Sequence, residues 1–219
     1  MAKTRELRER EVPKVRDMPA PRKSDGAAGG AMRQIFKWPF RAALAFLLWT
    51  GVRPWHLTLL SLILNVAVGR LIITGDWALA GVLLTIAGLC DVFDGAIARH
   101  RGEVRRSGAF LDSVVDRLSD MILFASLFWV MAARHEAQSA GLALVTLVVS
   151  LSVSQVRAEA EAVGLTLTEG FFQRLERFLA LMIGLLVPHT MFTVLVALAV
   201  LGSLTLLQRS FLALRGTTL

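Results

Sequence analysis

The sequence has almost no cysteine, and it contains two long stretches without formal charge. Its single cysteine, Cys90, cannot form an intramolecular disulfide, so a disulfide-rich scaffold is excluded. No Asp, Glu, Lys or Arg occurs from Phe178 to Gln208 or from Ala137 to Val156. Hydrophobic residues make up 55% of the 219-residue chain, which also excludes a disordered chain and a coiled coil. Because about 20 apolar residues span a bilayer as a helix, the sequence predicts a polytopic membrane protein.

The first thirty residues lack the apolar core of a signal peptide. Charged residues alternate along this segment, and Pro13, Pro19 and Pro21 are followed by the sequence GAAGG. This composition predicts a disordered basic cytoplasmic tail over residues 1–30. Its positive charge is expected to lie near anionic lipid headgroups, and no nucleic-acid partner is expected.

The remaining chain predicts an all-α fold. Cations spaced by four among aromatic side chains indicate a juxtamembrane amphipathic helix over residues 31–53, lying in the membrane interface. Residues 54–212 are expected to form an integral membrane bundle of six transmembrane helices, and residues 213–219 a cytoplasmic C-terminal tail. The six helices are predicted near residues 55–74, 77–99, 108–133, 139–162, 170–187 and 190–211, with tight turns at Gly75-Asp76, His135-Glu136 and Pro188-His189.

Basic residues are distributed unequally between the two ends of these helices. Of the 24 Lys and Arg residues, all but Arg70 and Arg134 lie on the side that holds both termini. Because cytoplasmic loops carry an excess of Lys and Arg, both termini are expected to face the cytoplasm. The predicted location is the cell (inner) membrane.

Five aspartates lie where a bilayer should exclude charge. Asp91 and Asp94 follow an uncharged helix that rises only about 21 Å, whereas the hydrocarbon core is about 30 Å thick. Their spacing puts them on one helix face, and Asp112, Asp116 and Asp120 share a face of the next helix. Two short-linked antiparallel helices would bring these faces together, and the facing carboxylates would repel one another strongly. One or two hard divalent cations are therefore expected there.

Simpler interpretations of these residues stay open. The aspartates could form salt bridges with nearby arginines, and Gly95, Ala98 and Gly108 could serve only close helix packing. The number of acids on two facing stripes favours a metal site. The small residues would also leave room for a ligand to approach the backbone.

The aspartates belong to a longer motif, which reads Asp91-x2-Asp94-Gly95-x2-Ala98-Arg99-x8-Gly108-x3-Asp112-x3-Asp116. At every position this motif matches the signature of the CDP-alcohol phosphatidyltransferase family, which the chain resembles from about residue 41 to residue 212. The resemblance implies transfer of the phosphatidyl group of CDP-diacylglycerol to an alcohol, with release of CMP. It also implies a homodimer, which is common in the family.

The resemblance further implies roles for individual residues. Two ions, Mg²⁺ or Mn²⁺, would be bound by Asp91, Asp94, Asp112 and Asp116, and Asp116 would also be the general base. The residues implied to line the nucleotide pocket are Thr58, Gly95, Ala98, Arg99 and Gly108. Asp120 lies outside the signature, and both a supporting role at the metal site and simple pairing stay open for it.

Three arginines indicate the acceptor alcohol. Around residues 154–165, 170–179 and 206–210 the chain resembles the branch of the family that makes phosphatidylinositol phosphate. In that branch, basic residues bind the phosphate of the acceptor, and the corresponding residues here are Arg157, Arg177 and Arg209. Positive-inside topology alone could also account for each of them. Arg174, in the same region, is expected to be structural or to face the membrane.

Two departures from the pattern leave the acceptor open. Glu159 stands where this branch usually has Arg, and Trp55 follows Pro54 where the family often has Asn or Asp. Inositol 1-phosphate is the expected acceptor and glycerol 3-phosphate the alternative; a free polyol or serine would leave the basic cleft without a phosphate. A divalent-cation transporter and a non-catalytic membrane protein are the alternatives from other functional classes.

Overall fold

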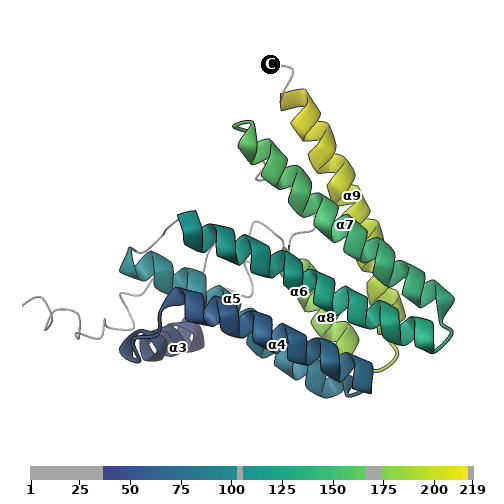
Figure 1. The fold of residues 1–219 in the computed structure, drawn as a ribbon, viewed down its shortest axis with the longest axis horizontal. Helices are drawn as coiled ribbons and strands as arrows, with labels where there is room; N and C mark the ends of the chain where they lie inside the picture. Colours follow the sequence, from purple (N-terminus) through teal and green to yellow (C-terminus); the bar gives the residue numbers. More distant parts are fainter. Residues whose placement is uncertain (1–36, 103–105, 166–173, 217–219) are drawn as a thin grey trace, which may run out of the picture.

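The structure, a computed structural model, describes residues 37–102, 106–165 and 174–216, and these are helical apart from the connecting turns (Figure 1). The all-α prediction is therefore confirmed for this part of the chain. The tail predicted over residues 1–30 lies outside the described residues. The helices are α3 (Lys37–Trp49), α4 (Pro54–Thr74), α5 (Trp77–Arg101), α6 (Arg106–Ala133), α7 (Ala137–Ala162), α8 (Arg174–Leu186) and α9 (Met191–Gly216).

The helix boundaries follow the predicted segments closely at most ends. The turns expected between helices are present, with left-handed backbone at Gly75 (φ 93°), His135 (φ 60°) and His189 (φ 64°). A left-handed residue ends a helix and lets the chain reverse direction. The last helix differs from expectation, because α9 extends to Gly216 and includes residues that were predicted to form the C-terminal tail.

Four of the described helices, α4, α5, α7 and α9, are long and apolar enough to cross a membrane. They expose large apolar side chains such as Ile63, Val148 and Leu207, which suit contact with lipid. Helix α6 carries the charged residues of the aspartate motif. Helix α8 has 13 residues, which rise only about 20 Å. The chain thus has the helices of a membrane protein. Six spans were predicted, and four of the described helices are long and apolar enough to be spans.

Helix α4 is central to the arrangement that positions the aspartates. It packs against both α5 and α6, while α8 packs against α5 and α9, and α7 packs against α6 and α9. In Figure 1 the pair α7 and α9 runs away from α4, α5 and α6 toward the C-terminus. The sequence predicted that the aspartate faces of α5 and α6 come together, and Asp91 does meet Asp112 and Asp116, although the backbones of the two helices pack little against each other among the described residues. The aspartate side chains, rather than the helix backbones, therefore meet across this boundary.

The lack of a side chain at Gly88 lets α8 pack closely against α5. A Cβ at Gly88 would lie 2.2 Å from Cζ of Phe178, so the phenyl ring of Phe178 lies directly against the backbone of α5. Asp91 follows Gly88 by about one helical turn, and Arg174 precedes Phe178 by about one turn. This contact therefore holds the start of α8 beside the acidic end of α5.

Helix α3 covers the same end of α5. The rings of Phe40 and Phe93 are stacked, with centroids 5.0 Å apart and an interplanar angle of 14°. Leu44 of α3 and Leu57 of α4 complete a small apolar cluster with Phe93 and Ile97. The cluster anchors the part of the predicted interfacial helix that the structure describes, next to the buried side chain of Asp94.

Candidate metal centre and its arginines

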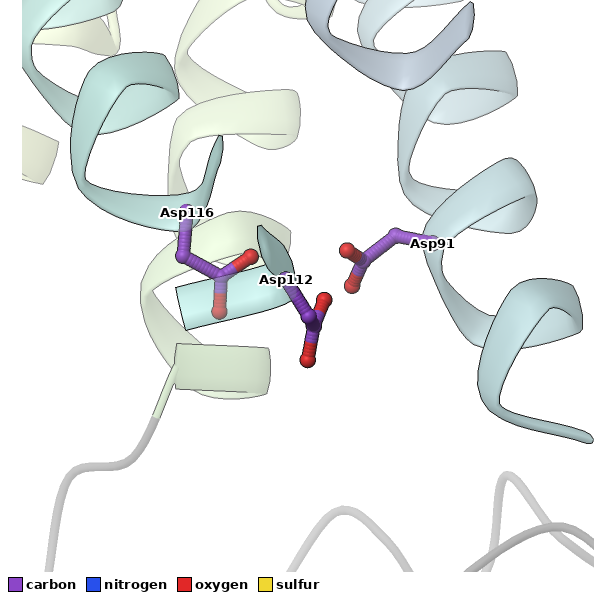
Figure 2. A group of neighbouring side chains, drawn as sticks. All are labelled: Asp91, Asp112 and Asp116. Carbon is purple, nitrogen blue, oxygen red and sulfur yellow. The ribbon is translucent and has the colours of Figure 1, made fainter. Parts of the chain in front are cut away.

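Three carboxylates converge between α5 and α6. Asp91, Asp112 and Asp116 each offer one oxygen, and these oxygens all lie within 4.8 Å of one another. Figure 2 shows Asp91 of α5 pointing toward the two aspartates of α6. All three side chains are half-buried. The spacing of four residues along α6 explains why Asp112 and Asp116 reach the same point.

The donor set fits a hard divalent cation. Carboxylate oxygens are the ligands that Mg²⁺ and Mn²⁺ prefer, and about 2.0–2.1 Å is the Mg²⁺–oxygen distance. Oδ1 of Asp91 is buried and has no hydrogen-bond partner among the described residues. A buried anionic oxygen without a partner is costly. A cation bound by the three aspartates would satisfy this oxygen and reduce the repulsion between their charges.

Arg174 also contacts this group. Its Nη1 lies 2.9 Å from Oδ2 of Asp91, and its Nη2 lies 2.6 Å from Oδ1 of Asp116. The expectation that Arg174 is structural or faces the membrane overlooked this bridge between carboxylates of two helices. One signal was available in the sequence: Arg174 precedes Arg177 by three residues, so the two share a helix face.

Asp94 lies apart from the three converging carboxylates. Its side chain is 6% exposed, and its Oδ2 accepts a hydrogen bond of 2.6 Å from Oγ1 of Thr58 on α4. The structure thus brings together three of the four aspartates that were predicted as ligands. It joins the fourth to Thr58, which was predicted for the nucleotide pocket.

The other residues of the motif lie near the ends of α5 and α6, where Gly95 and Ala98 are half-buried and Arg99 and Gly108 are exposed. Arg99 is exposed, and its Nη1 would lie 3.1 Å from a Cβ at Gly95, so its side chain folds back over this glycine. Ala98 is half-buried. Gly108 is exposed, and a Cβ there would meet no atom within 4 Å. Gly108 therefore leaves open space one helical turn before Asp112, whereas the Arg99 side chain covers Gly95.

A second polar group lies one helical turn further along α6. Asp120 forms an ion pair of 3.2 Å with Nη2 of Arg177 on α8 and accepts a hydrogen bond from the Ser150 hydroxyl on α7. Arg177 is 9% exposed, and its Nε has no hydrogen-bond partner among the described residues. Asp120 is thus paired with Arg177, and a supporting role at the metal site stays a prediction.

The three predicted acceptor arginines come from α7, α8 and α9, and Arg209 of α9 lies within electrostatic reach of the other two. Arg209 is 6% exposed, and the charges of both Arg157 and Arg177 act on it. Arg157 is exposed and pairs with Glu161 over 2.8 Å. Glu159 accepts a hydrogen bond from Gln155. The aspartate group is thus flanked by a cluster of cations, linked to it through Asp120 and Arg177.

Comparison with known proteins identifies relatives of this arrangement. The family model described as CDP-alcohol phosphatidyltransferase matches residues 52–207. A phosphatidylinositol phosphate synthase of Corynebacterium glutamicum is 37% identical over 170 residues, which cover 74% of this chain and 78% of the relative. An archaetidylinositol phosphate synthase of Methanothermobacter thermautotrophicus is 34% identical over 159 residues, which cover 70% of this chain and 79% of the relative.

Solved structures show the same fold. The crystal structure of Mycobacterium tuberculosis phosphatidylinositol phosphate synthase with CDP-DAG bound matches with a TM-score of 0.71 and 31% identity, covering 78% of this chain and 92% of that chain. The same enzyme in complex with manganese and citrate also matches with a TM-score of 0.71, covering 87% of that chain.

Proposed function

The chain belongs to the CDP-alcohol phosphatidyltransferase family, and we propose that it transfers the phosphatidyl group of CDP-diacylglycerol to inositol 1-phosphate, giving phosphatidylinositol phosphate and CMP. Membership of the family makes it a transferase of phospholipid biosynthesis. One observation carries the finer proposal: a group of carboxylates suited to a cation lies beside a cluster of arginines suited to a phosphate. The named relatives, which make inositol phosphate lipids, support it.

The proposed metal ligands are Asp91, Asp94, Asp112 and Asp116, and the proposed metal is Mg²⁺ or Mn²⁺, as two ions. The manganese in the related crystal structure supports this choice. When bound, the metal supplies positive charge that neutralises the pyrophosphate of the nucleotide lipid and the departing CMP. Asp94 would keep one oxygen on Thr58, so the hydroxyl of Thr58 would fix the orientation of that carboxylate.

Asp116 is proposed as the general base. The acceptor hydroxyl would attack the phosphorus of the phosphatidyl group, form the new O–P bond and release CMP as the old O–P bond breaks. The hydroxyl proton would pass to a carboxylate oxygen of Asp116. The half-buried position of Asp116 beside Asp91 and Asp112 supports this role, since the reacting phosphate would lie at the same point.

The nucleotide is proposed to lie over the exposed end of α5 and the start of α6. Gly95, Ala98 and Gly108 present little side chain there, and the exposed residue Arg99 folds its guanidinium over Gly95. A guanidinium can donate two parallel hydrogen bonds to phosphate. Thr58 would contribute through its contact with Asp94.

The phosphate of the acceptor is proposed to bind Arg157, Arg177 and Arg209. Charge-assisted hydrogen bonds to phosphate are strong, and two of these arginines are buried, which limits competition from water. Asp120 would hold the guanidinium of Arg177 in place. Glu159, which departs from the usual pattern, is hydrogen-bonded to Gln155 on its own helix.

We further propose six spans, with α6 and α8 crossing beside the four apolar helices. The site and both termini would face the cytoplasm at the cell (inner) membrane, because most Lys and Arg lie at that end. A homodimer in the bilayer is proposed from the resemblance to the family.

The test is CMP release by the purified protein with CDP-diacylglycerol and Mn²⁺. Inositol 1-phosphate, glycerol 3-phosphate and free inositol are compared as acceptors. Turnover with inositol 1-phosphate alone is expected. Arg209→Gln should raise the KM for this acceptor about tenfold or more, since each 1.4 kcal/mol of lost contact is tenfold. Arg134→Gln, which removes a cation that lies over Trp77 instead, is the matched control. Turnover with glycerol 3-phosphate alone would overturn the acceptor assignment.

A further inference from the structure

We propose that Arg174 is an internal counter-cation of the aspartate site, which a divalent cation must displace in order to bind. The inference rests on the proposed function, because that function assigns Asp91 and Asp116 to the metal. It adds a role for a residue of α8 that lies outside the signature motif.

The contacts of Arg174 carry the inference. Its guanidinium bridges two helices, with Nη1 at 2.9 Å from Oδ2 of Asp91 and Nη2 at 2.6 Å from Oδ1 of Asp116. Both aspartates belong to the group whose oxygens lie within 4.8 Å of one another. The guanidinium thus contacts the carboxylates that would bind the metal.

The position of Arg174 is fixed by packing within the bundle. The ring of Phe178, one turn later in α8, lies against the backbone of α5 at Gly88. The backbone of Arg174 therefore stays near Asp91 whether or not its side chain does. The side chain itself is 41% exposed, so protein does not enclose it on every side.

The guanidinium of Arg174 and a divalent ion cannot contact Asp91 and Asp116 at the same time. Three carboxylates so close together repel one another, and the guanidinium reduces this repulsion when no metal is bound. A divalent ion bound by Asp91 and Asp116 would repel the positive guanidinium and would take up the same carboxylates. Arg174 should therefore stabilise the metal-free protein and weaken metal binding, with no contribution to the stability of the metal-bound protein.

Two measurements on the full-length protein in detergent, without substrate, test this role. The first is the Kd for Mn²⁺, obtained from the electron paramagnetic resonance signal of free Mn²⁺. The second is the melting temperature in EDTA and in saturating Mn²⁺. The variants are Arg174→Gln, which removes the charge, and Arg174→Lys, which keeps the charge but loses the planar fork that bridges two carboxylates. Arg134→Gln is the control for loss of a cation elsewhere.

Arg174→Gln should bind Mn²⁺ about tenfold more tightly than the wild type, which corresponds to 1.4 kcal/mol. Its melting temperature should fall by about 2–4 °C in EDTA and stay unchanged in Mn²⁺. Arg174→Lys should lie between Arg174→Gln and the wild type in both measurements, and it serves as the test variant if the glutamine variant does not fold. The control should match the wild type in Mn²⁺ affinity, and any loss of stability from its lost contact with Trp77 should be equal in EDTA and in Mn²⁺.

Other results would overturn the proposal. Equal losses of stability with and without Mn²⁺ would mean that Arg174 keeps its contacts in the metal-bound protein. Unchanged or weaker Mn²⁺ binding by Arg174→Gln would mean that the guanidinium does not compete with the ion. If the wild type does not bind Mn²⁺, the assignment of the aspartates as a metal site is wrong. The metal part of the proposed function is then wrong as well.

Discussion

Thr58 of α4 donates a hydrogen bond of 2.6 Å to the carboxylate of Asp94 on α5. Both side chains are buried, at 5% and 6% exposure, so water competes little for either partner. The bond joins two helices that pack along each other. It also fixes the direction of one carboxylate of the proposed metal site, which makes Thr58 a positioning residue for Asp94.

Replacing Thr58 should therefore impair the reaction through Asp94. Thr58→Val keeps the shape of the side chain and removes the donor, and a hydrogen bond to a charged group contributes about 1.5–3 kcal/mol. CMP release should fall roughly tenfold or more, and half-maximal activity should need a higher Mn²⁺ concentration. Thr58→Ser keeps the hydroxyl and should retain most activity. Equal activity of the valine variant and the wild type would mean that the bond has no role in the site.

The contact between Gly88 and Phe178 should be sensitive to a single methyl group. Gly88→Ala would place a Cβ 2.2 Å from the ring, so α8 or the ring must move. Overpacking of this kind costs about 1–3 kcal/mol. The melting temperature in detergent should fall, and CMP release should fall with it, because Arg177, proposed to bind the acceptor phosphate, lies on the displaced helix.

Two further variants separate overpacking from a general effect of alanine. Gly141→Ala, in α7, would place a Cβ with no atom within 4 Å, and it should leave stability unchanged or slightly raised. Phe178→Leu combined with Gly88→Ala should recover part of the lost stability, since the smaller side chain makes room. A Gly88→Ala variant as stable as the wild type would contradict the packing described for α5 and α8.

Replacement of Asp120 should weaken binding of the acceptor and leave binding of the metal unchanged. Asp120→Asn removes the charge that pairs with Arg177 while it keeps the size of the side chain. The KM for inositol 1-phosphate should rise several-fold, because the guanidinium is no longer held, and the Kd for Mn²⁺ should change little. Ser150→Ala removes only the hydroxyl that donates to Asp120 and should have a smaller effect. A large loss of Mn²⁺ affinity in Asp120→Asn would place Asp120 in the metal site instead.

Local features of this fold could be predicted from the sequence. The spacing of Asp112 and Asp116 determines that they share a helix face, and the structure places them together. The turns at Gly75, His135 and His189 were also predictable, because polar residues and glycine separate apolar segments there. Such features depend on neighbours within a few residues, so no knowledge of the tertiary packing is needed.

The contacts of Arg174 and Asp94 depend on tertiary packing instead. Arg174 reaches Asp91 because the ring of Phe178 sets α8 against α5, and these residues are far apart in the sequence. Asp94 turns to Thr58 because α4 lies against that side of α5. The motif marks Asp94 as one of four equivalent acids, but periodicity along one helix cannot show which neighbouring helix each acid meets.

The central claim is that the converging aspartates bind the metal that the transfer reaction needs. It is tested most directly by CMP release from CDP-diacylglycerol and inositol 1-phosphate over a series of Mn²⁺ concentrations, for the wild type and Asp112→Asn. The wild type should be inactive after chelation and recover with Mn²⁺, whereas Asp112→Asn should need far more Mn²⁺ or stay inactive. Full activity of the chelated wild type, or an unchanged Mn²⁺ dependence in Asp112→Asn, would contradict the claim.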